Sequence, residues 1–229
     1  MTESAPDMKF PQIVGREEWT KRRQALLAEE KALSVARDNL NARRRRLPMT
    51  LVEKPYLFES TQGPLGFIDL FEQRPQLIVY HNMLNAGSDF VCPGCSYYSD
   101  HVANLNHLHA RRTTFVEISR ATVPQIERVK ARMGWKFPWY SCAGTSFHED
   151  FVESERQSFG LSVFLSVDGK IYQTYFTSGR GVEQPCNTFG FLDITPFGRQ
   201  ETWEDSPEGW PQEPAHSWLR LHDEYETPA

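Results

Sequence analysis

Two cysteines, Cys92 and Cys95, are separated only by Pro93 and Gly94 and precede a segment with helical character. Thiols three residues apart can share a disulfide or bind a metal ion. If a helix begins here, the first sulfur lies at its positive end, where backbone N–H groups favour the reactive thiolate. Proline suits the first helical turn because its missing N–H would have no partner there. We therefore predict that Cys92 is the attacking thiolate and that Cys95 is the buried resolving thiol.

Other side chains could assist this pair. His81 follows an apolar strand candidate and could hold a proton or a metal ion, although a hydrogen-bonded core histidine is the commoner case. Cys142 and His148 lie in a later loop, and either could be a third partner of the thiols or a zinc ligand. Arg180, between two glycines, could present its guanidinium to an anion, or it could be a solvated arginine in a turn. We predict no role for Cys186.

The composition places the chain among soluble globular proteins. Its 229 residues can bury a full core, so one large domain with appendages is expected. A formal net charge of -5 gives no general attraction to nucleic acid or to anionic membranes. The first residues do not resemble a signal peptide and no apolar run approaches membrane-spanning length, so a cytoplasmic location is expected. Cytosolic thiols are kept mostly reduced, so the four cysteines indicate redox or metal chemistry rather than structural disulfides.

The elements around the thiols alternate between strand and helix. Residues 56–71 contain short β-type segments, and a strand, a helix and a second strand then form a unit whose two strands should be parallel. Asp168 and Gly169 predict a tight hairpin between two later strands. The result is a mixed sheet with helices on its faces. The predicted ranges are strands at 76–83, 113–119, 161–167 and 170–176, and helices from 93 to about 110 and at 123–133, the last ended by Gly134.

The two ends of the chain differ from this central region. After a tail of residues 1–15, residues 16–46 contain no proline or glycine and predict one long helix. Apolar residues recur every seven positions along this helix and just beyond it and form a narrow seam; they are Trp19, Leu26, Leu33, Leu40 and Leu47. We expect a second subunit to cover the seam, which predicts a homodimer, with the alternative that the helix folds back over its own sheet. Residues 201–229 are acidic and rich in Pro and Trp. The predicted organisation is therefore a tail and helical arm at 1–50, a domain at 51–200 and a C-terminal tail at 201–229.

The order of elements, with Cys-x-x-Cys between the first parallel strand and its helix, resembles the thioredoxin-like superfamily. More narrowly, separated motifs along nearly the whole chain are similar to those of a bacterial thioredoxin-like family of uncharacterised function. These motifs are Gly15–Trp19, Leu77–His81, Cys92–Ser96, Met133–Trp139, Gly179–Gly181 and Trp218–Tyr225. The resemblance implies the thioredoxin-like fold, an α/β mixed sheet flanked by helices, and no established activity.

Two departures from active relatives bear on function. Thioredoxins place a proline directly before the first strand of the hairpin, whereas Ser158, Phe159 and Gly160 precede Leu161 here. That proline aligns an incoming extended chain, so weak activity on a generic protein disulfide is expected. Peroxiredoxins carry Pro-x-x-x-Thr-x-x-Cys at the nucleophile, and residues 85–92 do not match this pattern.

These observations favour a thiol–disulfide oxidoreductase acting on a protein or small-molecule disulfide or thiol, with no cofactor and no resident metal. Two alternatives stay open. A zinc-binding or redox-sensing module would need a third ligand such as His81, Cys142 or His148, or a second subunit. An assembly scaffold would use the long helix and keep the thiols as vestiges.

Overall fold

The computed structural model describes residues 11–152 and 158–225. The chain divides into two compact units, one of residues 49–190 with 216–229 and the other of residues 1–48 with 191–215. The first unit contains the sheet and the thiol pair, and we call it the sheet unit. Within the predicted terminal tails, residues 1–10 and 226–229 lie outside the described residues.

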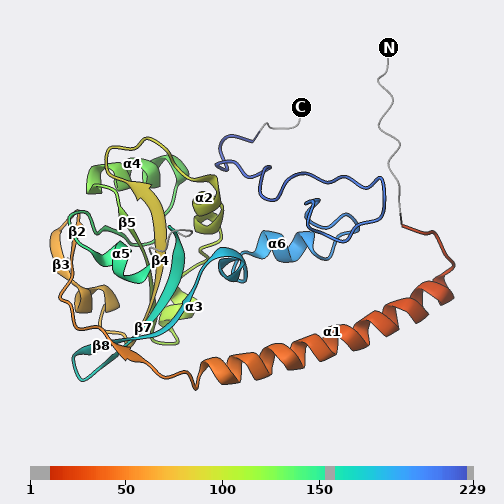
Figure 1. Ribbon diagram of the computed structural model, residues 1–229, viewed down its shortest axis with the longest axis horizontal. Coiled ribbons are helices and arrows are strands. Elements are labelled where there is room, and N and C mark those ends of the chain that lie inside the picture. Colours follow the sequence, from red (N-terminus) through yellow and green to blue (C-terminus); the bar gives the residue numbers. More distant parts are fainter. Residues whose placement is uncertain (1–10, 153–157, 226–229) are drawn as a thin grey trace, which may run out of the picture. The chain divides into compact units, whose positions relative to one another are not determined.

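The sheet unit is built on an eight-stranded mixed sheet in which β4 lies between β5 and β7 (Figure 1). Strands β4, β5 and β6 are parallel, and β7 pairs antiparallel with both β4 and β8. The strand order is β1-β8-β7-β4-β5-β6-β2-β3. The bounds are β1 Thr50–Leu51, β2 Leu57–Ser60, β3 Gly63–Gly66, β4 Gln76–Asn85, β5 Thr113–Arg120, β6 Trp139–Ser141, β7 Gly160–Val167 and β8 Lys170–Thr177.

Short helices cover both faces of this sheet. The core on one face contains side chains of α2 (Pro93–Asp100) and α4 (Val123–Met133), and we call it the thiol face because it includes Cys95. The core on the other face contains side chains of the 3-10 helix η1 (Phe67–Phe71) and of α5 (Phe147–Phe151). The remaining short helices of the described residues are α3 (Asn106–His109), η2 (Gly179–Glu183) and α6 (Asn187–Leu192).

The predicted fold class is confirmed by this arrangement. After β4 the chain passes through the thiol loop into α2 and then reaches β5, which is parallel to β4. The β7–β8 hairpin completes a thioredoxin-like mixed sheet. Asp168 and Gly169 both have positive φ, at 50° and 74°, as the tight turn between β7 and β8 requires. Helix α4 also has the predicted bounds, and Gly134 ends it at φ 68°.

Two local predictions were wrong. The helix from Pro93 does not continue to Ala110, because α2 ends at Asp100 and α3 begins only at Asn106. Asn104 stands in the gap, and its side chain accepts the backbone N–H of Asn106 at 3.0 Å, a bond that competes with helix continuation.

The second error concerns residues 67–71, which form a helical turn instead of a β-type segment. Asp69 accepts the backbone N–H of Gly66 at 2.8 Å and so stabilises the start of this turn. The turn also places Phe67, Leu70 and Phe71 in the core of the face opposite the thiols. Burial of these three side chains explains why the helical turn is favoured over a strand.

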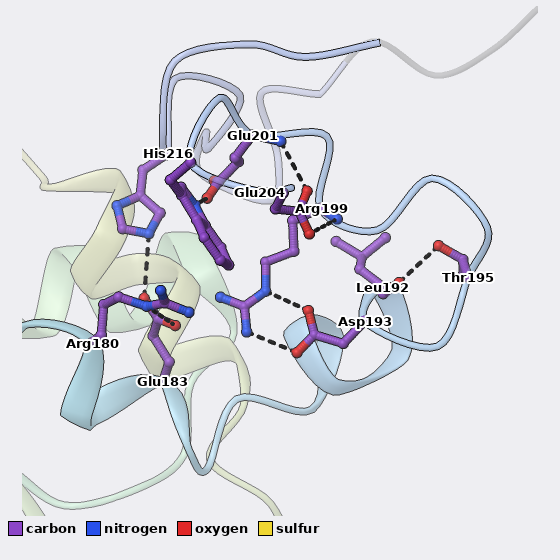
Figure 2. Close-up of polar contacts among 10 residues, drawn as sticks. Arg180, Glu183, Leu192, Asp193, Thr195, Arg199, Glu201, Glu204 and His216 are labelled. Carbon is purple, nitrogen blue, oxygen red and sulfur yellow. Dashed lines mark hydrogen bonds and ion pairs between the residues drawn. The ribbon is translucent and has the colours of Figure 1, made fainter. Parts of the chain in front are cut away.

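The second unit contains the predicted long helix, α1 (Arg16–Arg44), which Figure 1 shows as one continuous helix. None of the residues in α1 is buried, and the five seam residues from Trp19 to Leu47 are 44% to 70% exposed. The later part of this unit is held by polar contacts. Arg199 pairs with Asp193 through two bonds of 2.7 and 2.9 Å (Figure 2). The guanidinium of Arg199 also lies 5.6 Å from the ring centroid of Trp203.

Helix η2 depends on a close approach at Gly181, and this gives a stability test. A methyl group on Gly181 would overlap Thr177 Oγ1, whereas nothing lies within 4 Å of the corresponding position on Gly190. We expect Gly181→Ala to lower the free energy of unfolding by about 1–3 kcal/mol. The matched change Gly190→Ala in α6 should leave it unchanged or raise it by up to about 1 kcal/mol. Urea denaturation midpoints measure both, and equal midpoints for the two variants would contradict the steric argument.

Candidate thiol site

Cys92 and Cys95 lie where β4 has ended and α2 begins. Cys92 is the residue before the first helical turn and is partly exposed, and Pro93 occupies the first helical position. Cys95 lies within the first turn and is 2% exposed. Both cysteines are free thiols in the structure. The predicted contrast between an accessible first thiol and a buried second thiol is therefore present.

Hydrogen bonding separates the two thiols chemically. The thiol of Cys95 donates to Cys92, and the backbone N–H groups of Cys95 and Gly94 also donate to it; together they outweigh burial and lower the pKa of Cys92 to about 6. The same bond to Cys92, with burial, raises the pKa of Cys95 well above its usual value. At neutral pH Cys92 is thus mainly a thiolate and Cys95 a protonated thiol. This is the order expected from the sequence.

Cys95 is surrounded by groups from β4. The hydroxyl of Tyr80 and the backbone N–H of Met83 donate hydrogen bonds to the Cys95 sulfur. The ring of Tyr80 stacks on that of Tyr98 from α2, with centroids 3.8 Å apart. These contacts hold the first turn of α2 against the central strand and provide two donors for a thiolate that forms at Cys95.

A buried acid, Glu117, lies on β5 directly opposite Tyr80 of β4 in the strand register. Burial raises the pKa of Glu117 to about 8, although hydrogen bonds from Ser99 and Asn82 act in the opposite direction. Ser99 Oγ lies 2.6 Å from Glu117 Oε1 and 2.9 Å from the backbone oxygen of Cys95. Because Ser99 has one hydroxyl hydrogen, both contacts are satisfied when a protonated Glu117 donates to Ser99 and Ser99 donates to Cys95.

Cys92 lines a cavity of about 600 Å³ within the sheet unit. Its walls come from β4, α2, the residue before β7, η2, α6 and the C-terminal segment. Aromatic rings form much of the lining; they are Tyr80, Tyr97, Tyr98, Phe159 and Phe189. A third cysteine, Cys186, also lines this cavity, is 4% exposed, and its sulfur donates to the backbone oxygen of Val182 at 3.6 Å.

Charged groups gather where η2 meets the C-terminal segment. Glu183 accepts from Arg180 Nε at 3.4 Å and lies 3.5 Å from His216 Nε2 (Figure 2). The structure therefore brings Arg180 to the same cavity as the thiols. Its guanidinium already faces a carboxylate there, so it is not placed as a bare anion site.

The C-terminal segment, residues 216–225, is fixed to the thiol face. Leu219 and Leu221 are part of its core. Arg132 of α4 forms two bonds of 2.7 and 2.9 Å to Asp223, and His222 Nδ1 lies 2.7 Å from Asp100 of α2. These anchors make the segment a wall of the cavity.

The remaining predicted candidates lie on the opposite face. His81 is fully buried, its Nε2 lies 2.8 Å from Ser162 Oγ, and its ring stacks on Phe147. Burial, with the nearby His148, lowers the pKa of His81 well below its usual value, so His81 is a neutral core histidine. Cys142 belongs to the same core, and burial raises its pKa to about 12. The structure therefore brings His81, Cys142 and His148 to one region but does not bring them to Cys92.

Within residues 11–152 and 158–225, no three His, Cys, Asp or Glu side chains are grouped so that they could hold a metal ion. In the same parts of the chain, no helix is long and apolar enough to cross a membrane.

Sequence reasoning missed Glu117 and Ser99, and it did not place Cys186 beside the thiols. For Glu117 a signal was present, because an acid within the apolar run of a central parallel strand must be buried on both sides and so must be hydrogen-bonded. No comparable signal marks Ser99 or Cys186. They join the site only through the packing of α2 on β5 and of residues 179–189 beside the thiols.

The buried acid predicts a pH dependence of stability. The pKa of Glu117 is raised to about 8 in the folded chain, so its stabilising contribution is complete below the unfolded value of 4.5 and is lost as the pH rises through about 8. We expect the free energy of unfolding to fall by up to about 1.4 kcal/mol per pH unit across this range from this one group.

Glu117→Gln should flatten that decline, and the exposed change Glu127→Gln should keep it. Urea unfolding at a series of pH values measures the slopes. An unchanged slope in Glu117→Gln would show that Glu117 is ionised in the folded protein.

Comparisons with solved structures find only distant similarity. The search of curated proteins finds no match. Among solved structures, PrxQ from Xylella fastidiosa is 17% identical, with a TM-score of 0.41 over 62% of this chain and 90% of that chain. BsSco, a member of the Sco family of cytochrome c oxidase assembly proteins, is 16% identical, with a TM-score of 0.38 over 62% and 90% of the two chains. A hypothetical protein from Sinorhizobium meliloti is 12% identical, with a TM-score of 0.42 over 58% and 71%.

One family matches nearly the whole chain. Residues 8–225 match the family described as "Bacterial protein of unknown function (DUF899)". The match includes the thiol pair, Glu117 and the C-terminal wall of the cavity. The chain belongs to the DUF899 family.

Proposed function

We propose that this protein is a thiol–disulfide oxidoreductase that uses Cys92 as nucleophile and Cys95 as resolving thiol. The observation that carries the proposal is the opposite displacement of the two pKa values, with Cys92 lowered to about 6 and Cys95 raised. A structural cysteine pair has no need of such a difference. A nucleophile and a resolving thiol do need it, because one must be ionised and exposed while the other stays protonated until it is required.

The reaction follows from these roles. The Cys92 thiolate attacks one sulfur of the substrate disulfide, so that a Cys92–substrate bond forms and the substrate S–S bond breaks. The first substrate half leaves as a thiolate and takes a proton from water. Cys95 then loses its proton and attacks Cys92, which forms the Cys92–Cys95 disulfide and releases the second half. The substrate gains two electrons and the protein loses two, and an external dithiol must restore the reduced pair.

Neighbouring groups support the second step. When Cys92 is bonded to substrate it no longer accepts a hydrogen bond from Cys95, so the cause that raises the pKa of Cys95 most is removed. The donors from Tyr80 and Met83 remain and stabilise the thiolate of Cys95. Glu117 is neutral below pH 8 and adds no negative charge to this region. Tyr80 and Glu117 are thus positioning residues for the resolving step.

The rival functions differ in what they require of the chain. Zinc binding by Cys92 and Cys95 would need ligands from outside the described residues or from a second copy, because no third ligand stands beside the thiols in the described parts. Elemental analysis of the purified protein tests this alternative.

The proposed reaction suits a cytoplasmic setting, where a dithiol reductant is available.

Alkylation tests the proposed roles. We expect iodoacetamide to label Cys92 much faster than Cys95, with a half-maximal rate near pH 6, because the lowered pKa of Cys92 makes it a thiolate there. Mass spectrometry of pulse-labelled protein measures both sites, and it also detects the Cys92–Cys95 disulfide after oxidation.

The variants Cys92→Ser and Cys95→Ser separate the two steps. With a substrate disulfide, Cys95→Ser should accumulate the mixed disulfide at Cys92, and Cys92→Ser should accumulate none. The buried Cys142→Ser serves as control and should behave as wild type. Faster labelling of Cys95, or no disulfide between the pair across ordinary glutathione potentials, would disprove the assigned roles.

We also propose that α1 joins two copies of the chain. A helix of 29 residues is about 44 Å long and has no buried residue of its own. The four seam residues within α1, from Trp19 to Leu40, recur every seven positions and so form a narrow apolar stripe along the helix. A second copy offers an identical seam and is therefore the simplest surface to cover it.

Two charged substitutions in the seam test the dimer. We expect Leu26→Asp with Leu33→Asp to convert a dimer into a monomer, because two carboxylates would lose water at the interface. Light scattering gives the mass, and the rate of Cys92 alkylation should stay unchanged. The matched control Ala25→Asp with Ala32→Asp alters exposed residues outside the five seam positions and should stay dimeric. A monomeric wild type at tens of micromolar would refute the proposal.

A further inference from the structure

We propose that the cavity beside Cys92 selects small disulfides with an apolar, ring-sized body and disfavours protein disulfides. This inference rests on the proposed function, since it names the class of disulfide that Cys92 attacks. The inference depends on the residues that line the cavity. The proposed reaction of the two thiols does not itself require those residues.

The size and lining of the cavity suit a small apolar molecule. Its volume of about 600 Å³ is within the range of small-molecule sites. The apolar part of the lining includes Pro93, Phe159, Val182, Phe189 and Leu219. An apolar body gains about 25 cal/mol for each Å² that it removes from water. A zwitterionic body would lose the hydration of its charges against the same walls.

The charged residues of the cavity pair with each other. Glu183 contacts both Arg180 and His216 and is itself largely buried, with a side chain 12% exposed. The side chains of Arg180 and His216 are 61% and 48% exposed and therefore lie toward solvent. Arg220 donates to the backbone oxygens of Ser217 and Leu219. These pairings leave the apolar walls as the main surface offered to a ligand.

The C-terminal segment limits the shape of what can enter. Residues 216–220 form one wall, and Leu219 and Leu221 bury that wall in the core of the thiol face. Arg132 holds Asp223 through two bonds, and Asp100 holds His222. An extended polypeptide needs open space on both sides of the attacked sulfur. A wall fixed at several points leaves room for a compact molecule instead.

The chemistry is balanced with a dithiol as final reductant. Cys92 attacks the small disulfide, one half leaves as a thiol, and Cys95 releases the other half as the Cys92–Cys95 disulfide forms. Two electrons pass from the protein to the small disulfide. An added dithiol such as dithiothreitol then reduces the pair.

Three probes measure the preference in the reduced full-length protein under single-turnover conditions. Dithiodipyridine is a neutral aromatic disulfide, cystine is a small zwitterionic one, and insulin carries protein disulfides. Formation of the Cys92–Cys95 disulfide is followed by mass spectrometry. Each rate is divided by that of a synthetic Cys-Pro-Gly-Cys peptide with the same probe, which removes the intrinsic reactivity of the probe. We expect the corrected rate for dithiodipyridine to exceed both others by at least about tenfold, equivalent to about 1.4 kcal/mol.

A cavity-filling variant provides the matched comparison. Val182→Phe places a ring in the cavity and should abolish the preference, while Val167→Phe, at an exposed position at the end of β7, should retain it. If Val182→Phe does not fold, the test is whether a ligand in the cavity protects Cys92 of the wild-type protein from iodoacetamide. Dipyridylethane, which has carbon in place of the two sulfurs and cannot react, should slow iodoacetamide labelling of Cys92.

The outcomes separate the two proposals. Slow labelling of Cys92 and no Cys92–Cys95 disulfide with any probe would overturn the proposed function. Normal Cys92 reactivity with equal corrected rates, or with insulin fastest, would overturn the inference about the cavity alone. Absence of protection by dipyridylethane would also overturn it.

Discussion

The hydrogen bond from the Cys95 thiol to Cys92 is the interaction on which the rest of the site depends. It exists only because Cys92 precedes the first turn of α2 and Cys95 lies within that turn, so that the two sulfurs face each other while backbone N–H groups point at the first. The bond has opposite effects on its two partners, since the donor is kept protonated and the acceptor is kept ionised. Pro93 suits this geometry, because proline fits the first helical position.

The sheet then decides which other residues can take part. Successive residues of a strand point to opposite faces, so Tyr80 joins the thiols while the adjacent His81 joins Phe147 on the other side. The same alternation places Glu117 beside Ser99 and leaves Ile118 in the opposite core. One predicted partner of the thiols, His81, was therefore separated from them because it is one residue away from Tyr80 on the same strand.

The sequence was most informative where a local signal determines the structure. The Cys-Pro-Gly-Cys junction, the Asp168–Gly169 turn and the Gly134 helix end all require only neighbouring residues, and the structure has each of them as predicted. Prediction failed where long-range packing decides, as in the helical turn at Phe67–Phe71, and it also missed the local signal of Asn104 in the break of the helix after Asp100. It also could not find the cavity, since residues as distant in sequence as Tyr80, Val182 and Leu219 meet there. No periodicity or spacing in a single sequence predicts that these three residues line one cavity.

The negative charges of a Cys92 thiolate and of an ionised Glu117 would repel each other if both were present at the site. The Cys92 thiolate exists above about pH 6, whereas burial keeps Glu117 protonated up to about pH 8. Between these two pH values Cys92 is ionised and Glu117 is neutral. Ser99 can then link Glu117 to the backbone oxygen of Cys95. Above this range an ionised Glu117 would oppose a thiolate at Cys95 and would itself be buried with its charge uncompensated. In the proposed reaction, the acid opposite Tyr80 is thus neutral over the pH range in which Cys92 is already ionised.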